Sequence, residues 1–207
     1  MFNRSLYQRA RVSTIFAVLL AAYSALVLFA MGCTAPGLSF NAIDITGADY
    51  AHDFRLNAAD GSERALADFR GKIVLLFFGF TQCPDVCPTA LSRAAAVKKL
   101  LGVDGDKLQV IFVTVDPERD LPVVLREYTH AFDPSFIGLY GDVETTRKTA
   151  DAFRIVYAKV QTGASYTMDH TATSYAYDTR GQLRLAVRHT DTAEQLATDI
   201  RMLLKQQ

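Results

Sequence analysis

Two cysteines lie close together near the middle of the chain, in the stretch Cys83-Pro-Asp-Val-Cys87. A thiolate is both the nucleophile of disulfide exchange and a ligand for soft metal ions. The pair could therefore form a structural disulfide, act as a redox couple or supply part of a metal site. A structural disulfide is the least expected of the three, because so small a ring restricts the unfolded chain only slightly.

The spacing of the cysteines bears on the other two readings. Thioredoxin-type redox couples usually have two residues between their cysteines, whereas here there are three. The extra residue lets the two sulfur atoms move apart and bind a common partner such as a metal ion, instead of bonding only to each other. A metal site would need at least one further ligand. On the residues alone a structural role is commoner for a lone histidine than metal ligation. The chain offers four candidates: His52, His130, His170 and His189.

The elements around the cysteines should place them at a strand-to-helix junction. Residues 73–80 form an apolar run that suits a central strand buried on both faces. Pro88 and Gly102 are typical of the first turn and the end of a helix, which predicts a helix over about 88–101. A helix N-terminus lowers the pKa of a nearby thiol, so this location favours chemistry over packing.

The remaining pattern predicts an α/β fold with a central mixed sheet flanked by helices. A second apolar run should form a strand parallel to the first, joined to it by a right-handed crossover. Later residues predict a short strand, a helix, a further short strand, a hairpin and a last helix. The strands are expected over 108–115, 136–140 and 154–158, the hairpin over 171–177 with 183–188, and a helix over 143–153. Asp120 is the expected N-cap of a helix in the 120s, and Asp191 and Glu194 are expected to open the last helix.

Composition restricts the classes of partner. The 207 residues include 22 basic and 22 acidic side chains, and the body of the chain has no Lys/Arg cluster. Zero net charge gives no electrostatic reason to expect nucleic acid. The domain is large enough to bury its own core without a disulfide.

The N-terminus predicts export and membrane attachment. Three arginines and no acid precede residues 12–33, which carry no charge and are long enough to span a bilayer. The sequence before Cys33 also resembles a lipoprotein cleavage box, so lipidation of Cys33 and an uncleaved helix both stay open. We expect a signal or anchor segment over 1–33, a tether over 34–49 and a folded domain over 50–207. That domain should face the periplasm from the bacterial inner membrane.

Three motifs in order resemble the Sco/SenC family of copper-binding, thioredoxin-fold assembly proteins. They are the segment FFGFTQCPDVCP, the segment VTVDPERD and the segment MDHT, within residues 77–171. The similarity extends over about residues 50–205. It implies a thioredoxin-like fold and one copper ion bound by Cys83, Cys87 and His170. Asp85, Asp169 and residues 116–120 also match the family pattern, the last segment being expected to shape the loop beside the site.

The resemblance also implies a function in assembling the dinuclear copper site of cytochrome c oxidase subunit II. Two thiolates and an imidazole suit Cu(I), and they suit Cu(II) if an oxygen ligand joins. Zinc usually takes a fourth ligand, which the sequence does not offer nearby. Residues 166–175 lack the proline that thioredoxins place opposite their dithiol.

Two other functions stay open beside that of a copper chaperone. Without metal, Cys83 and Cys87 could act as a redox dithiol that keeps the cysteines of the oxidase or of another periplasmic copper carrier reduced. A redox or copper sensor would use the same residues. These observations favour a metallochaperone over an enzyme and leave thiol-disulfide oxidoreductase activity open.

Overall fold

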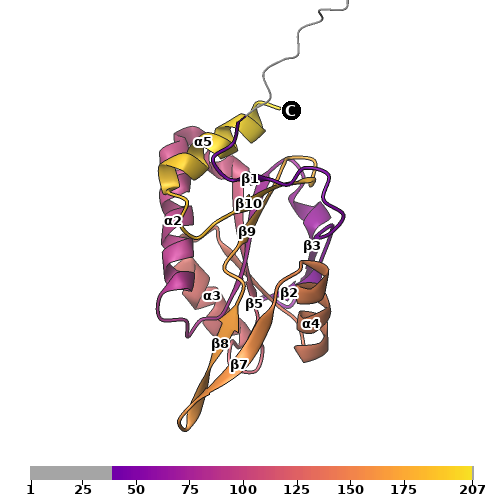
Figure 1. Ribbon diagram of the computed structural model, residues 1–207, viewed down its shortest axis with the longest axis vertical. Coiled ribbons are helices and arrows are strands. Elements are labelled where there is room, and N and C mark those ends of the chain that lie inside the picture. Colours follow the sequence, from indigo (N-terminus) through magenta and orange to yellow (C-terminus); the bar gives the residue numbers. More distant parts are fainter. Residues whose placement is uncertain (1–38, 207) are drawn as a thin grey trace, which may run out of the picture. The chain divides into compact units, whose positions relative to one another are not determined.

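An eight-stranded mixed sheet forms the centre of the computed structural model, which describes residues 39–206 (Figure 1). The strand order is β1-β10-β9-β4-β5-β6-β2-β3, and β7 pairs with β8 in a separate two-stranded sheet. The strands are β1 Ile43–Asp44, β2 Arg55–Ala58, β3 Glu63–Ala65, β4 Ile73–Gly79, β5 Leu108–Thr114, β6 Ile137–Tyr140, β7 Tyr157–Thr162, β8 Ser165–His170, β9 Ser174–Tyr177 and β10 Leu183–Val187. The helices are α2 Val86–Leu101, α3 Pro122–His130, α4 Val143–Ala152 and α5 Ala193–Leu204, with 3₁₀ turns over Leu66–Phe69 and Gly102–Lys107.

The two apolar runs of the sequence form the middle of the sheet. Every residue of β4 and of β5 is buried, as expected for strands covered on both faces. They pair in parallel from Ile73 opposite Leu108 to Gly79 opposite Thr114. The predicted β-α-β unit and the α/β class with a mixed sheet are therefore confirmed.

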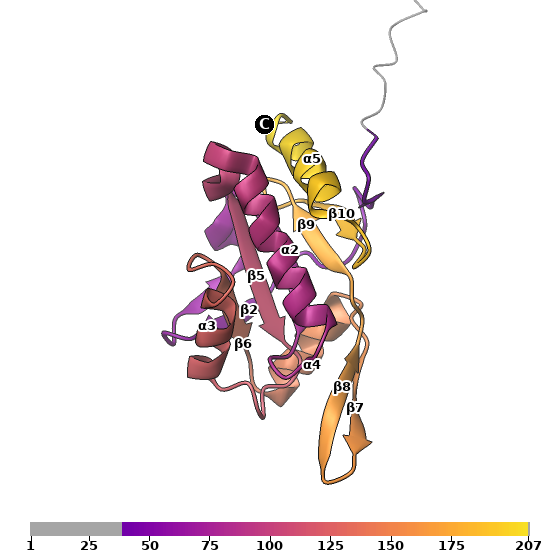
Figure 2. The same cartoon turned by 90° about the vertical axis from the view of Figure 1, so that its left-hand side faces the viewer.

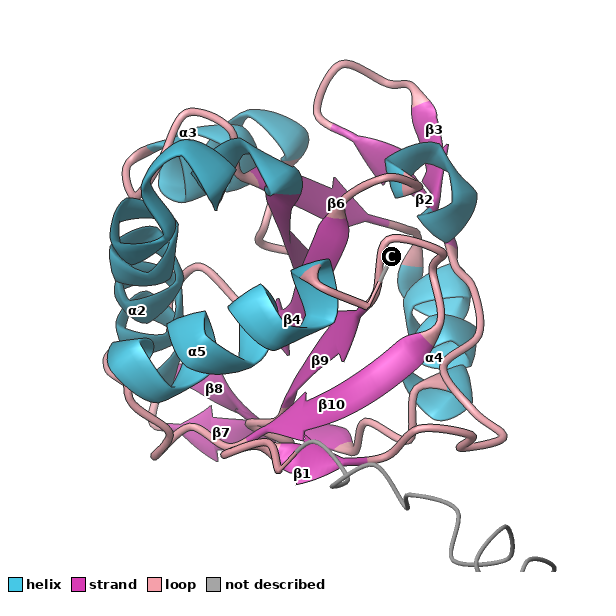
Figure 3. Ribbon diagram, turned by 90° about the horizontal axis from the view of Figure 1, so that it is seen from above, coloured by secondary structure: helices cyan, strands magenta, loops and turns pink. Residues whose placement is uncertain are grey.

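Helices cover both faces of this sheet. Seen from above, α2, α3 and α5 lie on one side of the strands and α4 lies on the other (Figure 3). The buried side of α2 carries Cys87 and small or aliphatic residues, among them Leu91, Ala94 and Val97. This packing fixes the helix start close to the end of β4.

The β7–β8 hairpin extends beyond the main sheet at the end where α2 begins (Figures 1 and 2). The sequence pattern predicted only a short strand over 154–158 here, and of those residues only Tyr157 and Ala158 lie in β7. Most of β7 is exposed, so it lacks the apolar alternation that marks a half-buried strand. The following strand β9 begins at Ser174, later than predicted.

The folded part of the chain begins before the predicted boundary at residue 50. Ile43 and Asp44 pair with β10 as an edge strand. The buried carboxylate of Asp199 in α5 accepts hydrogen bonds from the backbone N–H groups of Asn41 and Ala42, at 2.8–3.1 Å. Two residues of pairing are too few to give a strand pattern in the sequence. The predicted signal or anchor segment and residues 34–38 of the predicted tether lie outside the described residues.

Two helices begin at residues other than those predicted. The N-cap of α3 is Leu121, with Pro122 at the first helical position, whereas Asp120 was expected to cap the helix. Asp120 instead turns its carboxylate back to Thr81 and Thr114. The N-cap of α5 is Thr192, which forms a capping box with Gln195. The residues predicted to open that helix were Asp191 and Glu194.

Candidate metal centre

The cysteines lie on the connection from the central strand β4 to helix α2. Cys83 is in the loop, where its N–H donates to the Phe80 carbonyl at 3.2 Å. Cys87 is in the first turn of α2, and its N–H donates to Cys83 Sγ at 3.5 Å. The first helical turn thus directs a backbone donor at the sulfur of Cys83.

The two thiols differ in exposure. Cys87 is fully buried, whereas Cys83 is partly exposed. Gly79 makes room for the inner thiol, because a Cβ there would lie 2.7 Å from Cys87 Sγ. Burial raises the pKa of the Cys87 thiol. The expected lowering of thiol pKa at a helix start is therefore wrong for Cys87, where desolvation outweighs the helix terminus.

His170 reaches the cysteines from the last position of β8. Its Nδ1 donates to the Thr171 carbonyl at 3.0 Å, and its Nε2 lies 3.5 Å from Cys87 Sγ. The rings of Phe77 and Phe80 meet the imidazole edge-on, each with a centroid distance of 5.9 Å. Burial lowers the pKa of His170, which keeps the imidazole neutral and its Nε2 lone pair free for a metal.

The three predicted residues come together. The ligand atoms of Cys83, Cys87 and His170 all lie within 4.8 Å of one another. Within residues 39–206 no other histidine, cysteine or acidic residue joins this group. Asp85 and Asp169, which match the family motifs, are both outside it. Two sulfurs and one nitrogen form a donor set that suits copper better than a closed zinc site.

The Asp116–Asp120 loop braces the cysteine loop. Asp120 is 1% exposed, and its carboxylate accepts hydrogen bonds from the Thr81 N–H at 3.0 Å and from the Thr81 hydroxyl at 2.6 Å. The Thr114 hydroxyl donates to the same carboxylate at 2.6 Å. The segment therefore does shape the loop beside the site.

The same loop also contacts the hairpin that carries His170. Arg119 pairs with Asp116, and its Nη1 donates to the Tyr166 carbonyl at 2.8 Å. The Tyr166 hydroxyl donates to Asp116 Oδ1 at 2.9 Å. Sequence reasoning did not single out Tyr166 or Thr81, because their roles depend on contacts made across 50 and 39 residues of chain.

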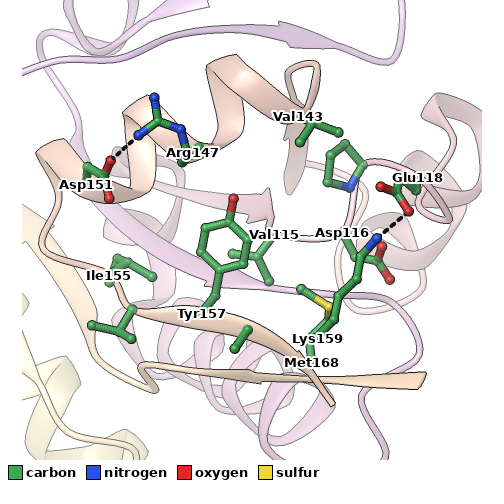
Figure 4. A pocket seen from close by; sticks show the side chains of 13 residues that line it. Val115, Asp116, Glu118, Val143, Arg147, Asp151, Ile155, Tyr157, Lys159 and Met168 are labelled. Carbon is green, nitrogen blue, oxygen red and sulfur yellow. Dashed lines mark hydrogen bonds and ion pairs between the residues drawn. The ribbon is translucent and has the colours of Figure 1, made fainter. Parts of the chain in front are cut away.

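A pocket of about 420 Å³ lies between the base of the hairpin, α4 and the loop that carries Asp116 (Figure 4). Its lining includes Val143 and Arg147 of α4, Tyr157 and Lys159 of β7, and Met168 of β8. Two ion pairs, Lys159 with Glu118 and Arg147 with Asp151, cross its rim (Figure 4). The lining mixes apolar side chains with three acidic and two basic ones.

Comparison with known families gives a match over nearly the whole described part of the chain. Residues 44–205 match the SCO1/SenC family model. The chain belongs to the SCO1/SenC family. A curated relative, the "SCO2-like protein" of Rickettsia felis, is 35% identical over 133 residues, which are 63% of this chain and 65% of the relative. The chain spans less than two thirds of the length of the first curated relatives that it matches.

Solved structures of this family have the same fold. ScoI of Bradyrhizobium japonicum with copper bound is 39% identical, with a TM-score of 0.67 over 73% of this chain and 97% of that one. The apo Sco1 protein from Thermus thermophilus is also 39% identical, with a TM-score of 0.70 over 82% and 99%. The thioredoxin-like fold expected from the motifs is confirmed. None of the helices within residues 39–206 has the length and apolar character needed to cross a membrane.

Proposed function

We propose that this SCO1/SenC protein is a copper chaperone that assists assembly of the dinuclear copper site of cytochrome c oxidase. Cys83, Cys87 and His170 are the proposed ligands. The observation that carries the proposal is the convergence of two sulfurs and an imidazole nitrogen within 4.8 Å, from two separate parts of the fold. The copper-bound relative from Bradyrhizobium japonicum supports copper as the metal.

Copper would be the cargo of this site. Three soft or borderline ligands satisfy Cu(I), and Cu(II) would take an additional oxygen ligand. Cys83 is the partly exposed one of the two thiols, so it is the cysteine that an incoming thiol of a recipient can replace first. The proposed recipient is subunit II of the oxidase, and the proposed donor is another periplasmic copper carrier.

The proposed location of the protein is the outer face of a bacterial inner membrane. The uncharged segment 12–33 would hold the domain there, either as a helix or through a lipid on Cys33. Residues 34–38 lie between that segment and the described residues in the sequence. Fractionation of the full-length protein, with and without Cys33→Ser, distinguishes lipid attachment from an uncleaved helix.

Metal stoichiometry tests the copper proposal. The reduced full-length protein should bind about one Cu(II) ion per chain, the number a single cluster of ligands can hold. Cys83→Ser, Cys87→Ser and His170→Ala should each lose most of this binding, while His130→Ala, which is outside the cluster, should keep it. Full stoichiometry and an unchanged Cu(II) spectrum in His170→Ala would overturn the three-ligand site.

A thiol-disulfide function is the second candidate, and the unequal exposure of the two thiols favours it. A partly exposed Cys83 can attack a partner disulfide, and buried Cys87 can then displace the reduced partner. Each turnover would transfer two electrons and oxidise Cys83 and Cys87 to a disulfide. This function should persist in His170→Ala, whereas copper delivery should not, so oxidase activity in cells carrying that variant separates the two.

A further inference from the structure

The hairpin that presents His170 is attached to the rest of the molecule by few contacts. It pairs with no strand of the main sheet. The pocket of Figure 4 separates the base of β7 from Val143 and Arg147 of α4, so close packing against that helix does not hold it. Because His170 must meet two buried or partly buried cysteines, something else has to fix where the hairpin lies.

Arg119 supplies the first part of that attachment. Its guanidinium lies over the ring of Tyr166, with Cζ 3.7 Å from the centroid. Its Nη1 donates to the Tyr166 carbonyl at 2.8 Å and to Gln82 Oε1 at 3.2 Å. Gln82 directly precedes Cys83, so one side chain contacts both the hairpin and the cysteine loop.

Asp116 supplies the second part. Its carboxylate is 1% exposed and accepts a hydrogen bond from the Tyr166 hydroxyl at 2.9 Å, while its other oxygen pairs with Arg119. Asp116, Arg119 and Tyr166 therefore form a closed set of contacts, which we call the hairpin clamp. Charged hydrogen bonds and cation–π contacts are stronger in such partly desolvated places than at an open surface.

The clamp is joined to His170 by the strand itself. Side chains two residues apart in a strand point to the same face, so Tyr166, Met168 and His170 share one face of β8. Four residues of strand separate Tyr166 from His170 by about 13 Å. A shift of β8 as one body would move Tyr166 and His170 together, and the 3.5 Å approach of His170 Nε2 to Cys87 Sγ would be lost.

We propose that Tyr166 is a positioning residue for the metal site. Held by Asp116 and Arg119, it fixes the hairpin so that His170 lies against the two cysteines. The positioning role of Tyr166 rests on the proposed copper function, whereas the contacts of the hairpin clamp do not depend on it. The clamp acts on the histidine side of the site and leaves the cysteine pair in place.

Two substitutions at residue 166 test the proposal. Tyr166→Leu removes the hydroxyl and the ring and should lower Cu(II) affinity about 10- to 100-fold, the range typical of groups that orient a metal ligand. Tyr166→Phe removes only the hydrogen bond to Asp116 and should lower affinity about fivefold. The matched control is Tyr157→Phe, which removes a hydroxyl from the same face of the hairpin, one that makes no hydrogen bond within the described residues.

A double-mutant cycle separates positioning from general destabilisation. In the His170→Ala background, Tyr166→Leu should cause no further loss of Cu(II) affinity, because its effect passes through His170. The nitrogen hyperfine signal of the imidazole in the Cu(II) spectrum should also weaken in Tyr166→Leu and stay intact in Tyr157→Phe. Additive losses, or an unchanged imidazole signal in Tyr166→Leu, would overturn the proposal.

Hydrogen exchange on the metal-free protein keeps this test independent of copper. Amides of β7 and β8 should exchange faster in Tyr166→Leu than in the wild type, while those of β4 should not change. If the wild-type protein bound no copper, the proposed function would fail and the exchange result would still decide whether the clamp holds the hairpin. Unchanged exchange in β7 and β8 would refute the clamp even in a protein that binds copper normally.

Discussion

The cysteines and the histidine of the candidate site are held by two very different parts of the molecule. The strand before the cysteines, β4, is buried along its whole length and pairs with β5 on one side and β9 on the other. The hairpin that carries His170 pairs only with itself, and β7 is mostly exposed. Two ligands thus lie at the junction of the core strand β4 with α2, and the third lies on an arm held by the hairpin clamp and by the buried side chain of Met168.

This difference suits a protein that must both hold and release a metal ion. Burial of β4 and β5 fixes the strand end and the start of α2, and so both ends of the loop that carries Cys83. The arm can withdraw by breaking a few hydrogen bonds and exposing the buried side chain of Met168, without unpairing any strand of the main sheet. We therefore expect the histidine to be the ligand whose position changes most easily during transfer.

The largest expected difference between the two halves is in Cu(I) affinity. Cys87→Ser should weaken Cu(I) binding by at least about 100-fold, because a soft ion loses a thiolate that no neighbour replaces. His170→Ala should weaken it only about tenfold, since two thiolates alone can hold Cu(I). Competition with a Cu(I) chelator measures both. Equal losses would mean that the arm is as essential to Cu(I) as the core ligands are.

A second difference should appear in the free energy of unfolding when alanine replaces one glycine in the core half of the site and one glycine in the arm. At Gly79 a Cβ would lie 2.7 Å from Cys87 Sγ and 2.8 Å from the Phe112 ring, so Gly79→Ala should lower the unfolding free energy by about 3 kcal/mol. At Gly163, in the hairpin turn, a Cβ meets nothing within 4 Å, and only its positive φ of 64° opposes the change. Gly163→Ala should therefore lower the unfolding free energy by about 1 kcal/mol.

Urea unfolding of the metal-free proteins measures both values. Similar losses at the two glycines would show that the space beside Cys87 is looser than its contacts indicate. Copper binding by Gly163→Ala should stay normal, because the hairpin turn lies at the end of the arm away from His170. A stable Gly79→Ala protein that bound copper normally would contradict the view that this glycine makes room for the inner thiol.

The core half of the site could be predicted from sequence because its signals are local. An apolar run, a proline at a helix start and a closing glycine specify β4 and α2 to within a few residues. The hairpin predicted over 171–177 with 183–188 likewise forms, as β9 and β10. In each case the residues that determine the structure are the residues that form it.

The arm half could not be predicted in the same way. His170 was selected through its motif, whereas the long hairpin that carries it shows no apolar alternation in β7. Tyr166 and Thr81 take their roles from partners far away in the chain. Asp120 was expected to cap a helix, but its carboxylate instead accepts a hydrogen bond from Thr81, 39 residues away in the chain. The predicted lowering of the Cys87 pKa was wrong for a similar reason, because the burial that raises this pKa depends on the whole fold.

The smallest expected effect concerns Asp120, which braces the cysteine loop from the core. Burial raises the pKa of its carboxyl, opposed by hydrogen bonds from Thr114 and Thr81. With a folded-state pKa above the unfolded value of 3.8, the folded protein binds more protons than the unfolded chain. The contribution of this group to stability is therefore full below pH 3.8 and is lost as pH rises through the folded pKa.

Asp120→Asn should remove this pH dependence. The unfolding free energy of the wild type minus that of the variant should fall as pH rises from 4 to 7, with a slope no steeper than about 1.4 kcal/mol per pH unit. Asp44→Asn is the control of opposite sign, because the Thr46 hydroxyl lowers the pKa of exposed Asp44 and its contribution is lost as pH falls. A wild-type advantage over Asp120→Asn that grew with pH would mean that the threonine hydrogen bonds outweigh burial at Asp120. The brace on the cysteine loop would then be strongest with the carboxylate ionised, and the core half of the site would tighten, not loosen, toward neutral pH.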